Sequence, residues 1–454
     1  MTEELEVVFE KLVYFFENRK FADLRMTALD MQPFDIAEFI ENNLDDKEQI
    51  VFFRLLPKEL ASDVFVELDA DTQEELVHSF TDKELKAVLD DMFLDDTVDI
   101  IEEMPANVVK RILKNADPQD RKNINLLLEY PDDSAGSIMT PEFISLTQSM
   151  TVEDALERIR QTGVNKETIY TCYVTDRKKH LIGVVTAKDL LLSDKKELIE
   201  NIMDVNVVTT DTLEDKEQVA LKLSNYDYLA LPVIDKEGCL VGIVTVDDAV
   251  DVLQEEATED IQKMAAILPT ETPYLKQSIW TIWKGRVFWL VLLLVSSTFT
   301  SLILSSYESN LNAVFAAFVP MLMGTAGNAG GQASVTVIRA IALNEVDFKD
   351  TLKVIWKEVR ASFFIGLTVA IVCFAKLMLI DRLYDESITV SVSLIISAVV
   401  LLSIVMAKII GCILPLIAKK CKLDPAVVAS PFMTTIVDTL SLILYCSIAI
   451  AIVV

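Results

Sequence analysis

PAVVASPFMTTIVDTLSLILYCSIAIAIVV, residues 425–454, is an apolar segment with a single charged residue, Asp438. Its length suffices for a helix that crosses a bilayer. A carboxylate at that depth costs roughly 2.5–3.5 kcal/mol on insertion scales, and such residues face a polar pathway or a partner. Hydroxyls precede it at Ser430, Thr434 and Thr435, and Thr434 shares a helical face with Asp438. The segment therefore predicts a membrane-spanning helix with a polar stripe that suits a hydrated cation.

Four further apolar runs precede this segment. The first contains residues 287–304, the second lies between Asn310 and Arg339, the third lies between Arg360 and Asp381, and the fourth runs from about 387 to 418. Lys376 and Lys408 interrupt the last two, and we interpret both as snorkelling or paired side chains. The sequence thus predicts five spans.

The second run is rich in glycine, and it places Asn328 and Gln332 four residues apart on one helical face. Such glycine density weakens an isolated helix. One interpretation is close helix packing through small residues. The other, which the two amides favour, is a polar lining along a water-filled path.

The short loops assign the orientation. Five Lys and Arg residues lie within 339–360 and three within 419–422, whereas the alternate loops offer only Arg382. Basic loops stay on the cytoplasmic side. The N-terminus is acidic and lacks the pattern of a cleaved signal peptide. We therefore expect a multi-pass protein of the cell (plasma) membrane with a cytoplasmic N-terminal half and its C-terminus outside.

The N-terminal half is strongly acidic. Residues 1–270 hold 27 Lys and Arg against 59 Asp and Glu, a net charge near −32. This excludes nucleic acid and anionic lipid as partners, and it favours solubility or cation binding. The six cysteines form no CxxC pair and there are only two histidines, so neither disulfides nor a soft-metal site is indicated.

An internal repeat appears at an offset of 59 residues. Residues 183–186 (GVVT) align with residues 242–245 (GIVT), and Asp189 aligns with Asp248. Each copy is predicted as a helix, two short strands and a closing helix. The pattern, over residues 133–252, resembles a tandem pair of CBS domains.

CBS pairs resemble modules that bind adenosine nucleotides through a Thr-x-x-Asp corner. The matching residues are Thr186 with Asp189 and Thr245 with Asp248. The same residues could instead cap the closing helices. Upstream, residues up to about 125 show 3.6-residue apolar spacing interrupted at Pro57, Thr81 and Pro105, which predicts short stacked helices in a small superhelical domain.

A helix rich in carboxylates follows the repeat. Asp247 with Asp251, and Glu255 with Glu259, are like-charged pairs at i and i+4, which destabilise a helix unless something neutralises them. A solvated acidic helix is one interpretation. The other is that divalent cations bridge it to acidic residues elsewhere, such as Glu75, Asp90, Asp91, Asp95 and Asp96.

Together these parts resemble the MgtE family of magnesium channels. The specific matches are residues 286–290 (RVFWL), 320–332 (PMLMGTAGNAGGQ), 424–426 (DPA) and 431–438. Ala326 and Gly331 depart from the common pattern, which leaves local backbone detail open there.

The resemblance implies a multidomain architecture. It comprises an α-helical superhelical N domain (1–130), α/β tandem CBS domains (131–246, divided at about 198), a connecting plug helix (247–270) and an all-α five-span transmembrane domain (271–454). It also implies a homodimer in the lipid bilayer and no enzymatic activity.

The implied pore residues are Asp438, Thr434, Thr435, Asn328 and Ser430, with Mg²⁺ as the transported ion. The implied regulatory Mg²⁺ ligands are Asp91, Asp95, Asp247, Asp248, Asp251, Glu255, Glu256, Glu259 and Asp424. ATP is a possible ligand of the CBS domains. Two alternatives stay open: a membrane signalling protein that senses nucleotides, and a channel for another divalent cation such as Mn²⁺, Co²⁺ or Ca²⁺.

Overall fold

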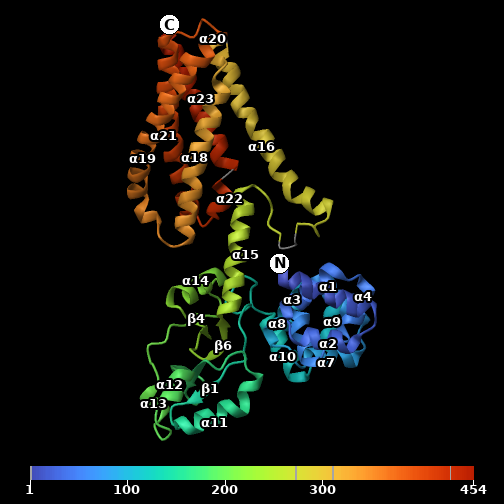
Figure 1. The fold of residues 1–454 in the computed structure, drawn as a ribbon. Helices are drawn as coiled ribbons and strands as arrows, with labels where there is room; N and C mark the ends of the chain where they lie inside the picture. Colours follow the sequence, from blue (N-terminus) through green and yellow to red (C-terminus); the bar gives the residue numbers. More distant parts are fainter. Residues whose placement is uncertain (1–2, 271–273, 309–310, 430, 454) are drawn as a thin grey trace. The chain divides into compact units, whose positions relative to one another are not determined.

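The computed structural model describes residues 3–270, 274–308, 311–429 and 431–453. The chain forms two compact units, Met1–Leu253 and Gln254–Val454 (Figure 1). The first unit contains the helical N domain and the CBS pair. The second contains the membrane helices. The predicted fold class is confirmed: a helical N domain, an α/β CBS pair and five long apolar helices are all present.

The N domain is a succession of short helices packed around a shared apolar core. They are α1 (Glu3–Glu17), α2 (Phe21–Leu29), α3 (Pro33–Asn43), α4 (Asp46–Phe53), α5 (Lys58–Val66), α6 (Ala70–Ser79), α7 (Asp82–Leu89), α8 (Leu94–Glu103), α9 (Ala106–Asn115) and α10 (Pro118–Leu127).

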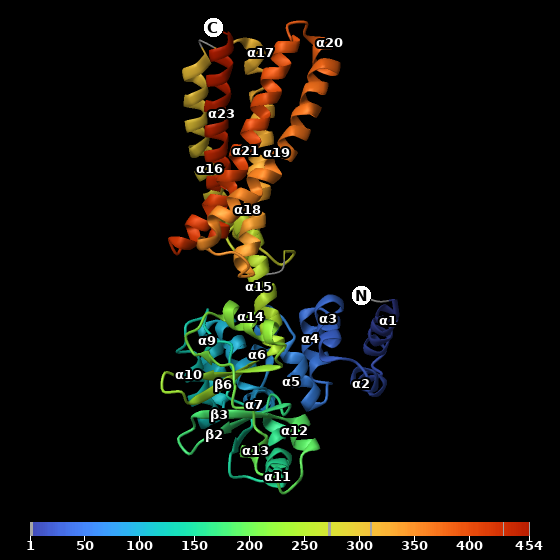
Figure 2. The ribbon, with the colours of Figure 1, turned by 90° about the vertical axis from the view of Figure 1, so that its left-hand side faces the viewer.

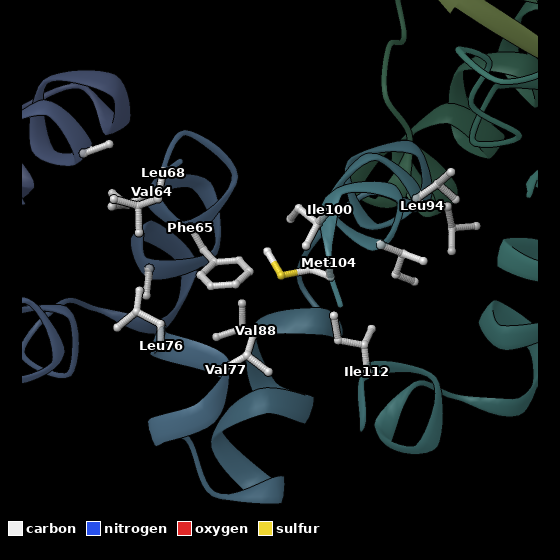
Figure 3. Close-up of a cluster of buried hydrophobic side chains, with 14 of the residues drawn as sticks. Val64, Phe65, Leu68, Leu76, Val77, Val88, Leu94, Ile100, Met104 and Ile112 are labelled. Atoms are coloured by element: carbon white, nitrogen blue, oxygen red, sulfur yellow. The ribbon is translucent and has the colours of Figure 1, made fainter. Parts of the chain in front are cut away.

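The interruptions expected from sequence are helix N-caps. Pro57, Thr81 and Pro105 immediately precede α5, α7 and α9, and Thr81 forms a capping box with Glu84. Val64 and Val77 are fully buried. Figure 3 shows this core, in which the side chains of Phe65 and Met104 point toward one another. The apolar spacing thus identified the buried faces correctly.

The CBS pair contains two copies of one small sheet. In the first, β1 (Ser145–Thr147) pairs in parallel with β2 (Thr171–Thr175), which pairs antiparallel with β3 (Leu181–Thr186). The second repeats this order with β4 (Thr210–Asp211), β5 (Ala230–Ile234) and β6 (Leu240–Thr245). The accompanying helices are α11 (Val152–Thr162), η1 (Gly163–Asn165), α12 (Ala187–Leu192), α13 (Ile199–Ile202) and α14 (Lys216–Tyr226).

The N domain and the CBS pair share one hydrophobic cluster. It extends from Leu127 of α10 through Met139 to Val219 and Leu223 of α14. The backbone N–H of Leu94, which opens α8, also donates to the Glu142 carboxylate at 3.1 Å. The acidic start of α8 is therefore placed against the CBS pair.

Among the residues that the structure describes, five helices are long and apolar enough to span a membrane, as predicted. The second unit comprises α16 (Ile279–Glu308), α17 (Ala313–Ala316), α18 (Val319–Ala342), η2 (Phe348–Asp350), α19 (Thr351–Lys376), the π-helical turn η3 (Leu377–Asp381), α20 (Arg382–Tyr384), α21 (Val390–Lys420), α22 (Pro425–Ala429) and α23 (Pro431–Val453) (Figure 2). The end of α15 (Val246–Met264) also belongs to it.

Helix α18 is continuous despite its glycines. These glycines allow close helix packing on one face and leave another face open. A Cβ on Gly330 would lie 2.9 Å from the Met433 sulfur and 3.2 Å from the Ala407 carbonyl oxygen, and one on Gly411 would collide with the Gly330 carbonyl. Small-residue packing therefore explains this face, where α18 meets α21 and α23. Gly324 has nothing within 4 Å of such a Cβ, so another face is open.

Both lysines within the spans are paired, as the sequence suggested. Lys408 of α21 lies 3.4 Å from the Glu358 carboxylate of α19, and the two side chains are only 7% and 18% exposed. Lys376 lies 2.9 Å from Asp381. The first pair joins α19 to α21 one residue away from Ala407, which contacts Gly330.

Candidate ion pathway and acidic clusters

A cavity of about 480 Å³ lies between α18 and α23. Its lining residues come from one face of each helix. They are Met323, Gly324, Gly327, Asn328, Gly331, Gln332, Met433, Thr434 and Asp438.

Asp438 is the only charged group of this lining, and glycine gives it room. A Cβ built on Gly327 would lie 3.6 Å from the Asp438 carboxylate oxygen, so a longer side chain there would crowd the carboxylate. Asn328, Gln332 and Thr434, whose side chains carry amide and hydroxyl oxygens, line the same space. Oxygen ligands suit hard cations, and Mg²⁺ in particular keeps several of its waters when bound.

The cavity contains three of the five pore residues expected from sequence: Asp438, Thr434 and Asn328. Thr435 is not in the lining, and its hydroxyl lies 3.1 Å from that of Ser296 on α16. Ser430 lies outside the described residues. The open glycine face, Met323 and Met433 were not anticipated as lining, although Gly324, Gly327 and Gly331 share one helical face.

A second group of interest is an acidic cluster inside the first unit. It unites Asp95 and Asp96 of α8 with Asp247 and Asp248 at the start of α15. Asp95 is 8% exposed, and its Oδ1 has no hydrogen-bond partner among the described residues. Burial of a carboxylate disfavours its charged form, and an oxygen without a hydrogen-bond partner adds to that cost. This side chain is therefore under electrostatic strain when ionised.

The pKa values of the cluster reflect that strain. Burial, followed by the neighbouring Asp96 charge, raises the pKa of Asp95 to about 7. Burial first, and Asp95 among the nearby charges, raises the pKa of Asp248 to about 7, although Thr245 donates a hydrogen bond that opposes the shift. Burial, followed by Asp248 and Asp247, raises the pKa of Asp96 to about 6. A bound cation would favour the ionised forms.

The other expected acidic residues are distributed differently. Asp91 forms an ion pair with Lys58 at 2.7 Å. Asp251 lies near Glu67, whose pKa is raised by burial and then by the Asp251 charge. Glu259 and Asp424 meet in the second unit, where both contact Lys263.

Glu255 and Glu256 also lie in the second unit and make interactions of their own. No three His, Cys, Asp or Glu side chains within the described ranges converge closely enough to hold a metal ion directly. Glu142 and Glu167, which lie near the acidic cluster, were not identified from sequence because they belong to the first CBS domain.

In both Thr-x-x-Asp corners the Thr hydroxyl bonds to the Asp carboxylate at the start of the following helix. Thr186 and Asp189 form a capping box at α12, with their side-chain oxygens 2.5 Å apart. The Thr245 hydroxyl donates to Asp248 at 2.6 Å. The two corners differ in surroundings. In the second corner, Asp248 lies in the acidic cluster, whereas in the first corner Thr186 is exposed.

Family models match three parts of the chain. Residues 319–448 match the family model described as MgtE, a divalent cation transporter. Residues 31–133 match the MgtE intracellular N domain, and residues 135–195 and 199–255 match CBS domains.

Full-length relatives agree with these matches. The chain is 35% identical to the magnesium transporter MgtE of Thermus thermophilus, covering 94% of both chains. It is 31% identical to MgtE of Bacillus subtilis, covering 97% of this chain and 96% of that one. A crystal structure of the cytosolic domain of the Mg²⁺ channel MgtE in complex with ATP matches with 34% identity and a TM-score of 0.50, covering 54% of this chain and 99% of that one.

The acidic cluster predicts a pH-dependent stability of the first unit. Because the folded-state pKa of Asp95, about 7, exceeds its ordinary value of 3.8, the folded state binds more protons than the unfolded state between these values. The contribution of Asp95 to the stability of the folded first unit is fully present below about pH 4. It is lost as the pH rises through about 7. We expect Asp95→Asn, in chelator, to raise hydrogen-exchange protection of α8 at least about tenfold at pH 8 and less at pH 5.

The matched control is Asp23→Asn on the exposed surface of α2, which should leave α8 protection unchanged. Hydrogen exchange of the full-length protein, followed by mass spectrometry, compares each variant with the wild type at the same pH. Equal protection of wild type and Asp95→Asn at pH 8 would contradict the strained carboxylate.

Proposed function

The chain belongs to the MgtE family of divalent cation transporters, and on that premise we propose that it is a Mg²⁺ channel that admits Mg²⁺ and is closed by cytosolic Mg²⁺. The observation that carries the proposal is the cavity in which Asp438 is the only charged lining residue. An anchor for a signalling protein has no use for a carboxylate placed there at an energetic cost.

At the proposed pore site, Asp438 attracts a hydrated Mg²⁺ by charge, and Asn328, Gln332 and Thr434 hydrogen-bond its retained water. The volume of about 480 Å³ supports passage of an ion with its waters. Binding through water leaves the ion weakly enough held to depart, which conduction requires.

We place the channel in the plasma membrane as a homodimer, with two copies of Asp438, one per subunit, facing a shared path. The facing carboxylates offset their burial through the ion between them. The basic loops put the first unit in the cytoplasm and the C-terminus outside.

Closure is proposed to depend on the carboxylates of α8 and α15. Two carboxylates about 4 Å apart repel by up to about 4 kcal/mol at an effective dielectric constant of 20. The raised pKa values of Asp95 and Asp248 support such repulsion, after burial as the main cause. Mg²⁺ bound through water would remove it, so high cytosolic Mg²⁺ holds the acidic surfaces together, and low Mg²⁺ releases them and opens the channel.

The pore assignment predicts that Asp438→Ala abolishes Mg²⁺ uptake into proteoliposomes, because the cavity loses its only charge. Uptake should fall to the rate of protein-free liposomes while the oligomer remains intact in size-exclusion chromatography. Asp385→Asn, in the loop before α21, is the control and should transport normally. Undiminished flux in Asp438→Ala would refute the pore site, and faster wild-type uptake of Mn²⁺ or Co²⁺ than of Mg²⁺ would favour the other cations.

The gating scheme predicts that the combined variant Asp247→Asn, Asp251→Asn and Glu255→Gln needs a severalfold higher internal Mg²⁺ concentration to close, since three ligand charges are gone. A control variant with the same charge change on the CBS surface, Glu153→Gln, Glu157→Gln and Asp194→Asn, should close normally. An unchanged closing concentration in the first variant would mean that the α15 carboxylates are merely solvated.

We also propose ATP as a ligand of the first CBS corner. The ATP complex of the similar cytosolic domain supports this, as does the exposed position of Thr186. Asp189→Ala should weaken ATP binding to the purified protein at least about tenfold in isothermal titration calorimetry, since a hydrogen bond to a charged group contributes about 1.5–3 kcal/mol. Asp154→Ala removes the equivalent member of the capping box on α11 and should bind ATP normally. Equal losses in both variants would indicate a structural effect alone.

A further inference from the structure

A lysine side chain lies among the carboxylates where α15 ends. The Lys263 ammonium lies 2.7 Å from Asp424 Oδ2 and 2.8 Å from Glu259 Oε1. All three side chains are between 21% and 36% exposed. Ion pairs that are partly removed from water and have two partners are stronger than solvated surface pairs.

Hydrogen bonds hold both Asp424 and the segment that follows Lys263. The second oxygen of Asp424 accepts a hydrogen bond from the Ala426 backbone N–H at 2.8 Å, at the beginning of α22. On the other side, the Leu268 N–H donates to the Gly285 carbonyl of α16 at 2.9 Å. The Gln262 side chain accepts from the Thr270 N–H at 2.9 Å and donates to its carbonyl.

The charges around Lys263 do not cancel. Asp260 stands beside the pair, and its pKa is raised by burial and then by the Asp424 charge. Burial alone would lower the pKa of Lys263, but hydrogen bonds with Asp424 and Glu259 raise it, so the amine stays protonated. One ammonium thus faces three carboxylates, Glu259, Asp260 and Asp424, and the group keeps an excess of negative charge.

We propose that Lys263 is a built-in counter-ion that competes with divalent cations for Glu259 and Asp424 and holds the end of α15 to the start of α22 when divalent cations are scarce. The effect of this contact on gating rests on the proposed function, in which Glu259 and Asp424 are candidate Mg²⁺ ligands. At low Mg²⁺, the Lys263 ammonium would then hold these carboxylates together, as Mg²⁺ does at high concentration. A closing contact of this kind sets a limit on how far low Mg²⁺ releases α15.

The contact can be measured without relying on transport. Hydrogen exchange of residues 256–268 is followed in the full-length protein, in chelator and across added Mg²⁺. In wild type, we expect protection in chelator because the ion pair persists. In Lys263→Gln, protection in chelator should fall about tenfold, the equivalent of about 1.4 kcal/mol, and added Mg²⁺ should restore it, because three carboxylates are then available to the ion.

Two further variants make the test specific. The charge swap Lys263→Asp with Asp424→Lys should regain protection in chelator. Lys353→Gln removes the exposed pair of Lys353 with Asp350 in the same unit and should leave residues 256–268 unchanged. In proteoliposomes, Lys263→Gln should also raise uptake severalfold at low internal Mg²⁺.

The outcomes separate this inference from the proposed function. Full protection of residues 256–268 in Lys263→Gln in chelator would overturn the counter-ion, whatever the flux. Loss of protection in Lys263→Gln together with no Mg²⁺ uptake by the wild type would support the counter-ion and refute the channel. Protection lost in Lys263→Gln that Mg²⁺ does not restore would overturn the competition with divalent cations.

Discussion

The backbone contact between α18 and α21 is the constraint on which the membrane unit depends. Gly330 lies directly against Gly411, and a Cβ at position 330 would meet Ala407 of α21 together with Met433 and Val437 of α23. A side chain at position 330 would press on both neighbouring helices, because its Cβ would lie 2.9 Å from the Met433 sulfur and 3.2 Å from the Ala407 carbonyl oxygen. The contact brings α23 alongside α18, and only then can Asp438 share a cavity with Gly324, Gly327 and Gly331. Close packing on one face of α18 and an open path on another are thus two uses of the same residue type.

The charged side chains inside the membrane unit are of two kinds. Lys408 and Glu358 are both mostly buried and neutralise each other across α19 and α21. Removing one partner of a buried pair costs about 3–5 kcal/mol, because the other charge is left uncompensated. Asp438 has no comparable cation in the cavity lining. The contrast between a neutralised pair and an uncompensated carboxylate distinguishes a structural charge from one suited to attract a mobile ion.

The repulsion among the carboxylates of α8 and α15 is relieved in a different way in each of two clusters. Around Asp95, negative charges are brought together by the packing of α8 against the CBS pair, and protons partly relieve the repulsion near neutral pH. At the end of α15, a lysine relieves it instead. In the proposed gating scheme, a divalent cation competes with a proton in the first group and with the Lys263 ammonium in the second. The two clusters would therefore respond differently to pH and to Mg²⁺, even though both are acidic patterns in the sequence.

The sequence by itself determined the five spans, the CBS repeat, the helix starts at Pro57, Thr81 and Pro105, and the isolation of Asp438 in an apolar segment. These follow from local rules: length of apolar runs, periodicity and caps. Helical spacing also placed Thr434 beside Asp438 and Asn328 beside Gln332. It could not show which neighbour each face would meet.

Only the tertiary structure determined which residues lie next to one another across the fold. It directed Thr435 toward Ser296 instead of the cavity, paired Asp91 with Lys58, assembled Asp95 with Asp248, and placed Lys263 between Glu259 and Asp424. The physical reason is that charge interactions depend on distances between residues far apart in the chain, and packing of whole helices sets those distances.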